Sequence, residues 1–183
     1  MMEKTLKQYD SIIANCKDIF SKKMKDYGTA WRVLRPSSIT DQLYIKAKRI
    51  STIEEAGVSM VDEGVVPEYI AIVNYCVMGL VQLELGPSDS NDLSNEKVLE
   101  YYRNHLETAR SLMINKNSDY GEAWREMRVS SITDLILMKI HRTKQIEDNK
   151  GETIISEGID ANYHDMINYA VFAMILLEEQ NAN

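Results

Sequence analysis

The sequence repeats itself, and this duplication limits the folds that the chain can adopt. KDYGTAWRVLRPSSITD at residues 25–41 returns as SDYGEAWREMRVSSITD at residues 118–134, with Asp26 over Asp119 at an offset of 93. The offset becomes 94 from Glu63 and Glu157 onward. The turn-rich segment GPSDSNDLS at residues 86–94 separates the copies. We therefore predict two helical repeats, residues 1–86 (copy one) and 94–183 (copy two).

Each copy predicts three helices. The first carries an apolar stripe at a spacing of three and four residues, which is typical of an amphipathic helix; its members in copy one are Leu6, Tyr9, Ile13, Cys16 and Phe20. The corresponding helix of copy two covers residues 98–113. The second helix is expected to begin at SITD, residues 38–41 and 131–134, with the serine hydroxyl as its cap, and to end near residues 55 and 148.

The third helix of each copy, residues 67–85 and 160–179, is apolar on nearly every face. Such a helix must be buried all round, and three short helices cannot bury one of their own. We therefore expect the two third helices to pack at the centre of one bundle. The predicted fold class is all-α, two tandem three-helix units packed as a pseudo-twofold helical bundle.

Composition narrows the classes of partner. A net charge of −7 argues against bulk binding to nucleic acid or to an anionic membrane, since both need a cationic surface. The longest apolar run, residues 169–177, is about half of the ~18 to 20 residues that span a bilayer, and the N-terminus lacks the apolar core of a signal peptide. Cys16 and Cys76 suggest neither a disulfide framework nor a metal site. We expect a cytoplasmic protein without a membrane segment.

The shared DYG-x-A-W-R block is the first candidate site. In copy two it brings Trp124, Arg125 and Arg128 to the predicted start of a helix. Helix N-termini favour phosphate, arginine can bind it with two hydrogen bonds, and tryptophan can stack on a base. The alternative interpretation is that the aromatic residues anchor the loop to the core while the arginines satisfy carbonyl groups.

A second candidate site lies on the second and third helices of copy two. Glu157, Asp160, His164 and Asn168 follow helical spacing, so acids there could face Glu147 on the preceding helix. Carboxylates on two facing helices can hold Mg²⁺. The alternative is a solvated first turn, where the helix dipole favours acids. Asn168, like Asn74 in copy one, is either a site residue or a buried polar clamp between the copies.

The string DYGEAWREMRVSSITD, with Lys139, Arg142, Glu157, Asp165 and the closing Asn168-Tyr169-Ala170, resembles the nucleotide modification associated domain family, and both copies share it. The arrangement of acids is also similar to the all-helical nucleoside triphosphate pyrophosphohydrolases of the MazG type. That likeness implies Mg²⁺ on acids of two facing helices and hydrolysis of nucleotides to monophosphate and pyrophosphate.

The leading hypothesis is a protein of this family that binds a nucleotide or nucleoside phosphate, with hydrolysis to pyrophosphate by means of Mg²⁺ as one option. It assigns residues as follows: Arg125, Arg128, Lys139 and Arg142 to phosphate, Trp124 and Asn168 to the rest of the substrate, Glu147, Glu157 and Asp165 to metal, and Glu157 and Asp165 to catalysis. The alternatives are a non-catalytic helical module that binds a nucleotide or a protein, and a scaffold. A homodimer is left open.

Overall fold

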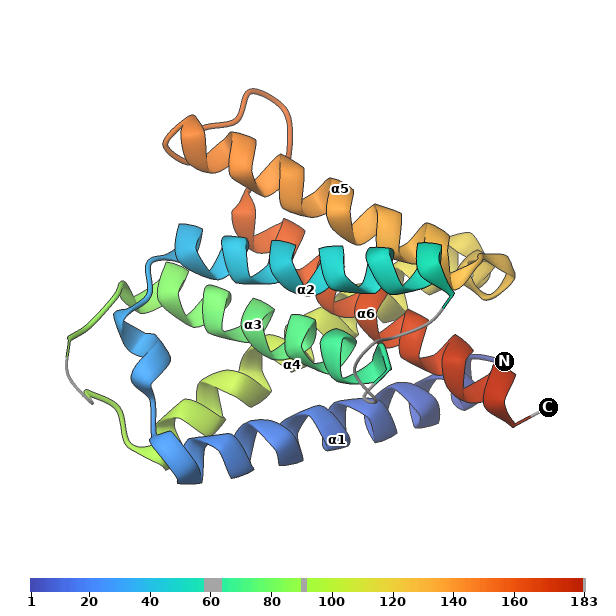
Figure 1. Ribbon diagram of the computed structural model, residues 1–183, viewed down its shortest axis with the longest axis horizontal. Coiled ribbons are helices and arrows are strands. Elements are labelled where there is room, and N and C mark those ends of the chain that lie inside the picture. The colour runs from blue at the N-terminus through green and yellow to red at the C-terminus, as the bar shows by residue number, and fades with distance from the viewer. Residues whose placement is uncertain (58–63, 90–91, 183) are drawn as a thin grey trace.

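The computed structural model describes residues 1–57, 64–89 and 92–182, and the described chain is built of helices. The helices are α1 (Met2–Tyr27), η1 (Ala30–Val33), α2 (Pro36–Ala56), α3 (Val66–Leu85), α4 (Asn95–Tyr120), η2 (Ala123–Glu126), α5 (Val129–Asp148) and α6 (Ile159–Asn181). The two ends of the chain lie near each other at one end of the molecule (Figure 1). The all-α class and the three long helices of each copy are confirmed.

The third helices, α3 and α6, pack against each other and form the centre of the core, as predicted. Gly79 of α3 is needed at this contact, because an added Cβ would lie 2.7 Å from a ring carbon of Tyr163 on α6. By length and hydropathy alone α3 could span a membrane, but 67% of that window is buried by the rest of the molecule. This is the burial expected of a central helix in a helical bundle.

A polar network between α2 and α5 occurs twice, with the copies exchanged. Thr40 donates to Glu147 at 2.6 Å and lies 2.7 Å from the hydroxyl of Tyr163. The corresponding hydroxyl of copy two, on Thr133, donates to Glu54 at 2.6 Å and lies 2.7 Å from the hydroxyl of Tyr69. Each copy therefore completes the hydrogen bonds of the other.

The two buried asparagines form a second pair of equivalent contacts. Asn168 accepts from Tyr9 at 2.7 Å and donates to the carbonyl of Ala109 at 3.0 Å. The corresponding side chain, Asn74, accepts from Tyr102 at 2.8 Å and donates to the carbonyl of Cys16 at 3.2 Å. Every contact has its counterpart in the other copy, which supports the clamp interpretation; the pseudo-twofold axis itself stays a prediction.

The predicted serine caps are wrong. α2 begins at Pro36 and α5 at Val129, so the N-cap residues are Arg35 and Arg128, and neither makes a side-chain capping hydrogen bond. Pro36 suits the first helical position because of its fixed φ, but Val129 begins α5 at the equivalent position without a proline. The serines lie inside the first turn, and the hydroxyl with a long-range role is that of the threonine two residues later.

Candidate functional site

Trp124 and Arg125, two of the residues predicted from the shared DYG-x-A-W-R block, contact other side chains of the protein. The ring of Trp124 is buried, stacks on Phe172 at 4.1 Å between ring centroids, and has the guanidinium of Arg125 4.5 Å from its centroid. The tyrosines of the block, Tyr27 and Tyr120, are 56% and 74% exposed and do not anchor it. The tryptophan thus serves the core, as the alternative interpretation proposes.

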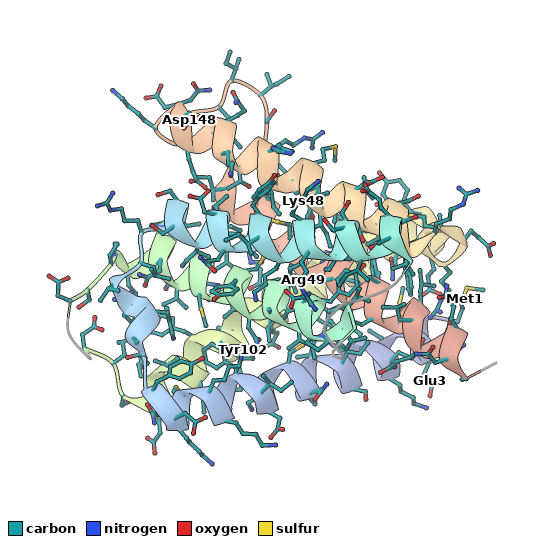
Figure 2. All side chains as sticks on the ribbon, viewed as in Figure 1. Met1, Glu3, Lys48, Arg49, Tyr102 and Asp148 are labelled. Carbon is teal, nitrogen blue, oxygen red and sulfur yellow. The ribbon has the colours of Figure 1, made fainter. Side chains whose placement is uncertain are left out.

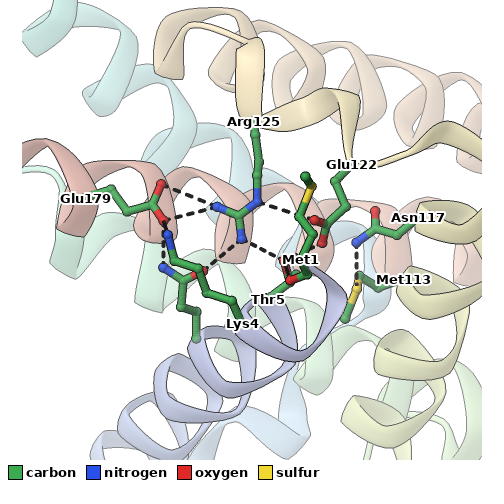
Figure 3. Close-up of polar contacts among 9 residues, drawn as sticks. Met1, Lys4, Thr5, Met113, Asn117, Glu122, Arg125 and Glu179 are labelled. Atoms are coloured by element: carbon green, nitrogen blue, oxygen red, sulfur yellow. Dashed lines mark hydrogen bonds and ion pairs between the residues drawn. The ribbon is translucent and has the colours of Figure 1, made fainter.

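Arg125 ties both ends of the chain to the η2 turn (Figure 3). Its guanidinium donates to Glu179 at 3.1 Å, to Thr5 at 2.6 Å and to Gln8 at 2.8 Å. Glu122 lies 3.6 Å from its Nε and also bonds the Thr5 hydroxyl. This network engages both terminal nitrogens of the guanidinium, so Arg125 acts here as a structural residue.

The corresponding arginine of copy one, Arg32, is 2% exposed and is also held by the protein. It donates to the carbonyl of Gly86 at 2.8 Å, to Gln82, and to Asp92 at 3.0 Å. Arg32 and Arg125 therefore both satisfy protein acceptors. Arg128, the remaining arginine predicted from this block, is exposed at the start of α5.

Lys139, Arg142 and Glu157 come together in a groove of about 920 Å³ between α5 and the segment 149–158. We call it the α5 groove; its lining is Met138, Lys139, His141, Arg142, Gln145, Ile146, Asn149, Glu152, Thr153, Ile154, Ile155, Ser156, Glu157 and Asn162. This end of α5, marked by Asp148, projects beyond the neighbouring helices (Figure 2). Arg142 is exposed and makes no hydrogen bond or ion pair with any described residue, so its guanidinium can receive an anion.

Asp165 lies beside the groove and is held by two lysines. Its carboxylate oxygens accept from Lys116 at 2.6 Å and from Lys139 at 2.8 Å. Burial opposes ionisation of this group, but the two ammonium groups prevail and lower its pKa. Asp165 is therefore an ionised anchor for Lys139, and both of its oxygens have protein partners.

The three acids predicted to hold a metal are not gathered. Glu157 was predicted to share a helix face with Asp160 and His164. It does not, because α6 begins after it, at Ile159, and Glu157 is exposed. Glu147 bonds to Thr40, and burial raises its pKa. Over the described ranges, no three His, Cys, Asp or Glu side chains are grouped as metal ligands are.

Sequence reasoning missed three features of this region. Lys116, the second partner of Asp165, lies outside the predicted motifs, although Lys23 repeats it at the same offset of 93. The threonine-glutamate pairs and the tyrosines that bond the asparagines recur at that offset too. Comparing all repeated polar positions, beyond the most similar block, would have singled out these residues.

Comparison with known proteins agrees with the duplicated architecture. The family profile described as nucleotide modification associated domain 1 matches residues 23–83 and 116–177, which together exceed half of the chain. Each match lies within one copy, so the tandem resemblance noted in the sequence is confirmed. No curated protein and no solved structure matches the chain. The likeness to MazG-type enzymes stays a prediction.

Proposed function

The chain belongs to the nucleotide modification associated domain 1 family, and on that premise we propose that it binds a nucleoside phosphate in the α5 groove. The observation that carries the proposal is Arg142, an exposed guanidinium in a groove of ligand size that has no acidic partner among the described residues. Arginine presents a planar pair of donors that matches two phosphate oxygens. Lys139, held by Asp165, lines the same groove one helical turn away.

The rest of the groove suits the remaining parts of a nucleotide. Glu152 and Glu157 line it, and their carboxylates can accept hydrogen bonds from sugar hydroxyls and base amino groups. Ile154 and Ile155 are 100% and 95% exposed, an apolar surface that a bound base would cover. A pocket with one cationic end, acceptors and an apolar wall favours a phosphate ester with a polar ring system.

The described residues do not fit a resident Mg²⁺, which the MazG likeness implies. Both oxygens of Asp165 hold lysines, Glu147 is bonded to Thr40, and Glu157 is exposed on a different segment. Mg²⁺ needs oxygen ligands in near-octahedral geometry, and ammonium groups in their place oppose its binding. We therefore propose binding without hydrolysis, and keep hydrolysis as an outcome of the test.

The location that we propose is the reduced cytoplasm. Cys16 and Cys76 are both free and buried. Burial raises the pKa of Cys16 to about 12 and that of Cys76 well above its usual range, so neither thiol is suited to nucleophilic catalysis. This supports a protein whose cysteines are packing residues.

Thermal unfolding against a panel of ribonucleotides and deoxyribonucleotides, with and without Mg²⁺, tests the proposal. A ligand at a hundred times its dissociation constant adds about 2.7 kcal/mol, or roughly 5 to 11 °C for a chain of this size. Arg142→Gln should abolish the shift. Arg49→Gln is the matched control, because Arg49 is the corresponding residue of copy one and already donates to Glu68 at 2.8 Å.

The controls decide between the alternatives. If Arg142→Gln binds the nucleotide as tightly as the unmodified chain, the α5 groove is not the site. Release of pyrophosphate that depends on Mg²⁺ and is lost in Glu157→Gln would replace binding alone by the pyrophosphohydrolase hypothesis. The absence of a shift across the whole panel would favour the protein-partner or scaffold alternative.

A further inference from the structure

Copy one contains a second cavity, which shares no lining residue with the α5 groove. It has a volume of about 460 Å³ and lies between α1, the turn at Gly28 and α3. We call it the copy-one cavity; its lining is mostly apolar and includes the aromatic residues Phe20, Tyr27, Trp31 and Tyr75, with Lys23 as its charged member. The volume lies within the range of small-molecule pockets.

The cavity is open because copy one lacks two side chains that fill the corresponding place in copy two. Ala71 stands where copy two has Asp165, and Met78 stands where it has Phe172. In copy two the aspartate binds Lys116, and the phenylalanine stacks on Trp124. Their smaller or more flexible counterparts leave space between α1 and α3.

The same replacements leave a charge and an aromatic ring available. Lys23, which corresponds to Lys116, is exposed and makes no ion pair or hydrogen bond within the described part of the chain. Among the described residues, the aromatic ring that Trp31 meets is that of Phe20, tilted and 6.4 Å away between centroids, in contrast to the stacked pair of copy two. Asn74 also lines the cavity; its side-chain oxygen accepts from Tyr102 and its nitrogen donates to the carbonyl of Cys16.

From this geometry we propose that the copy-one cavity binds a small planar aromatic molecule that carries one anionic group. The ring lies against Trp31 and the neighbouring aromatic side chains, and the anion meets the ammonium of Lys23. Both polar atoms of Asn74 in the wall already have a protein partner, which disfavours a polar sugar in the interior. This site is separate from the proposed nucleotide groove and does not depend on it.

Fluorescence titration with anilinonaphthalene sulfonate, an aromatic anion, tests the proposal on the full chain. We expect saturable binding at one site, weakened more than about tenfold by Ala71→Asp, which installs the residue of copy two and places a carboxylate beside the bound anion. Lys23→Gln should weaken binding about 2- to 5-fold, as removal of an exposed charge pair does. Lys22→Gln is the matched control, because Lys22 pairs with Asp18 at 2.7 Å and does not line the cavity.

A neutral dye of similar shape, phenylnaphthylamine, separates the two parts of the proposal. Lys23→Gln should leave its affinity unchanged, whereas Ala71→Asp should lower it by occupying the cavity. Circular dichroism checks that Ala71→Asp folds. If this variant does not fold, Lys23→Gln tests the proposal by itself, because it should weaken binding of the sulfonate and leave binding of the neutral dye unchanged. Wild-type affinity for the sulfonate in Lys23→Gln, or in a folded Ala71→Asp, would overturn the proposal.

Discussion

In copy two Asp165 holds Lys116 and Lys139, whereas the corresponding residue of copy one is Ala71. Copy one supplies its carboxylate one helical turn earlier, from Glu68, which lies 3.5 Å from the ammonium of Lys46 and 2.8 Å from the guanidinium of Arg49. The lysine of the second helix is thus neutralised in both copies, by carboxylates from different positions. On the first helix of each copy, Lys116 of copy two is paired with Asp165, whereas Lys23 of copy one has no such partner among the described residues.

The contacts that join the copies have not diverged in this way. The threonine-glutamate and tyrosine-asparagine pairs keep the same partners in both directions. Because these groups are buried or half-buried, losing one partner leaves another group unsatisfied. Differences between the copies are therefore tolerated around the cavities and opposed at the shared interface.

The largest expected effect would test the similarity of the copies. Asn168→Ala should lower the free energy of unfolding by about 2 to 4 kcal/mol, because it leaves the Tyr9 hydroxyl buried without a partner and removes the hydrogen bond to the Ala109 carbonyl, which keeps only its bond within α4. Asn74→Ala should cost a similar amount. Urea denaturation measures both, with the exposed Asn115→Ala as control. A neutral effect at either asparagine would show that the equivalent hydrogen bonds are not equally important.

A smaller effect is expected where the copies differ. Asp165→Asn should cost about 1 to 3 kcal/mol, less than the loss of a fully buried ion pair, because the Lys116 side chain is 50% exposed. Glu68→Gln should cost less, because both of its partners are more exposed than Lys139. Urea denaturation at neutral pH measures both changes. Equal losses of unfolding free energy in the two variants would contradict the proposed difference between Asp165 and Glu68.

The pH dependence of the Asp165 contribution has a defined sign. Burial raises the pKa of this group, but Lys116 and Lys139 outweigh burial and hold it below the usual 3.8. The native state therefore favours the ionised form, and the stabilisation is complete above about pH 4 and is lost as the pH falls through the lowered pKa. The stability curves of Asp165→Asn and the unmodified chain should converge at the acidic end.

The smallest effect concerns two histidines that copy one replaces by Ile12 and Ile70. Burial lowers the pKa of His164 below 6.5, and the neighbouring His105 lowers it further. Burial also lowers the pKa of His105, although Glu84 opposes this. Asp160 and Asp165 raise the pKa of His164, and Lys116 lowers it. The unfolded chain thus binds protons more readily, and stability should fall as the pH drops below 6.5 until the native groups titrate.

His164→Ile, the residue of copy one, should reduce the loss of stability between pH 7 and pH 5. Thermal unfolding at both pH values measures this loss, and His141→Gln, at an exposed position of α5, is the control. An unchanged loss in His164→Ile would assign the pH dependence to other groups.

Periodicity and the repeat predicted the helices and their central packing because both depend on apolar patterns that are local in sequence. Arg125 could not be assigned in this way, since its partners Glu179, Thr5 and Gln8 come from both ends of the chain. Lys139, predicted to bind phosphate, lines the α5 groove, but its pairing with Asp165 depends on how α5 meets α6 and could not be read from a motif. Position in a motif indicates the chemistry of a side chain, and the fold decides which partner uses it.

The exchanged threonine-glutamate contacts have a consequence for how the two halves can evolve. If a single repeat formed the same bundle as two separate chains, every substitution would occur twice, once on each side. Covalent linkage removes that constraint, so Ala71 can coexist with Asp165 in one molecule. One half can then keep an ion pair while the other keeps an opening, and the shared interface preserves the architecture during their specialisation.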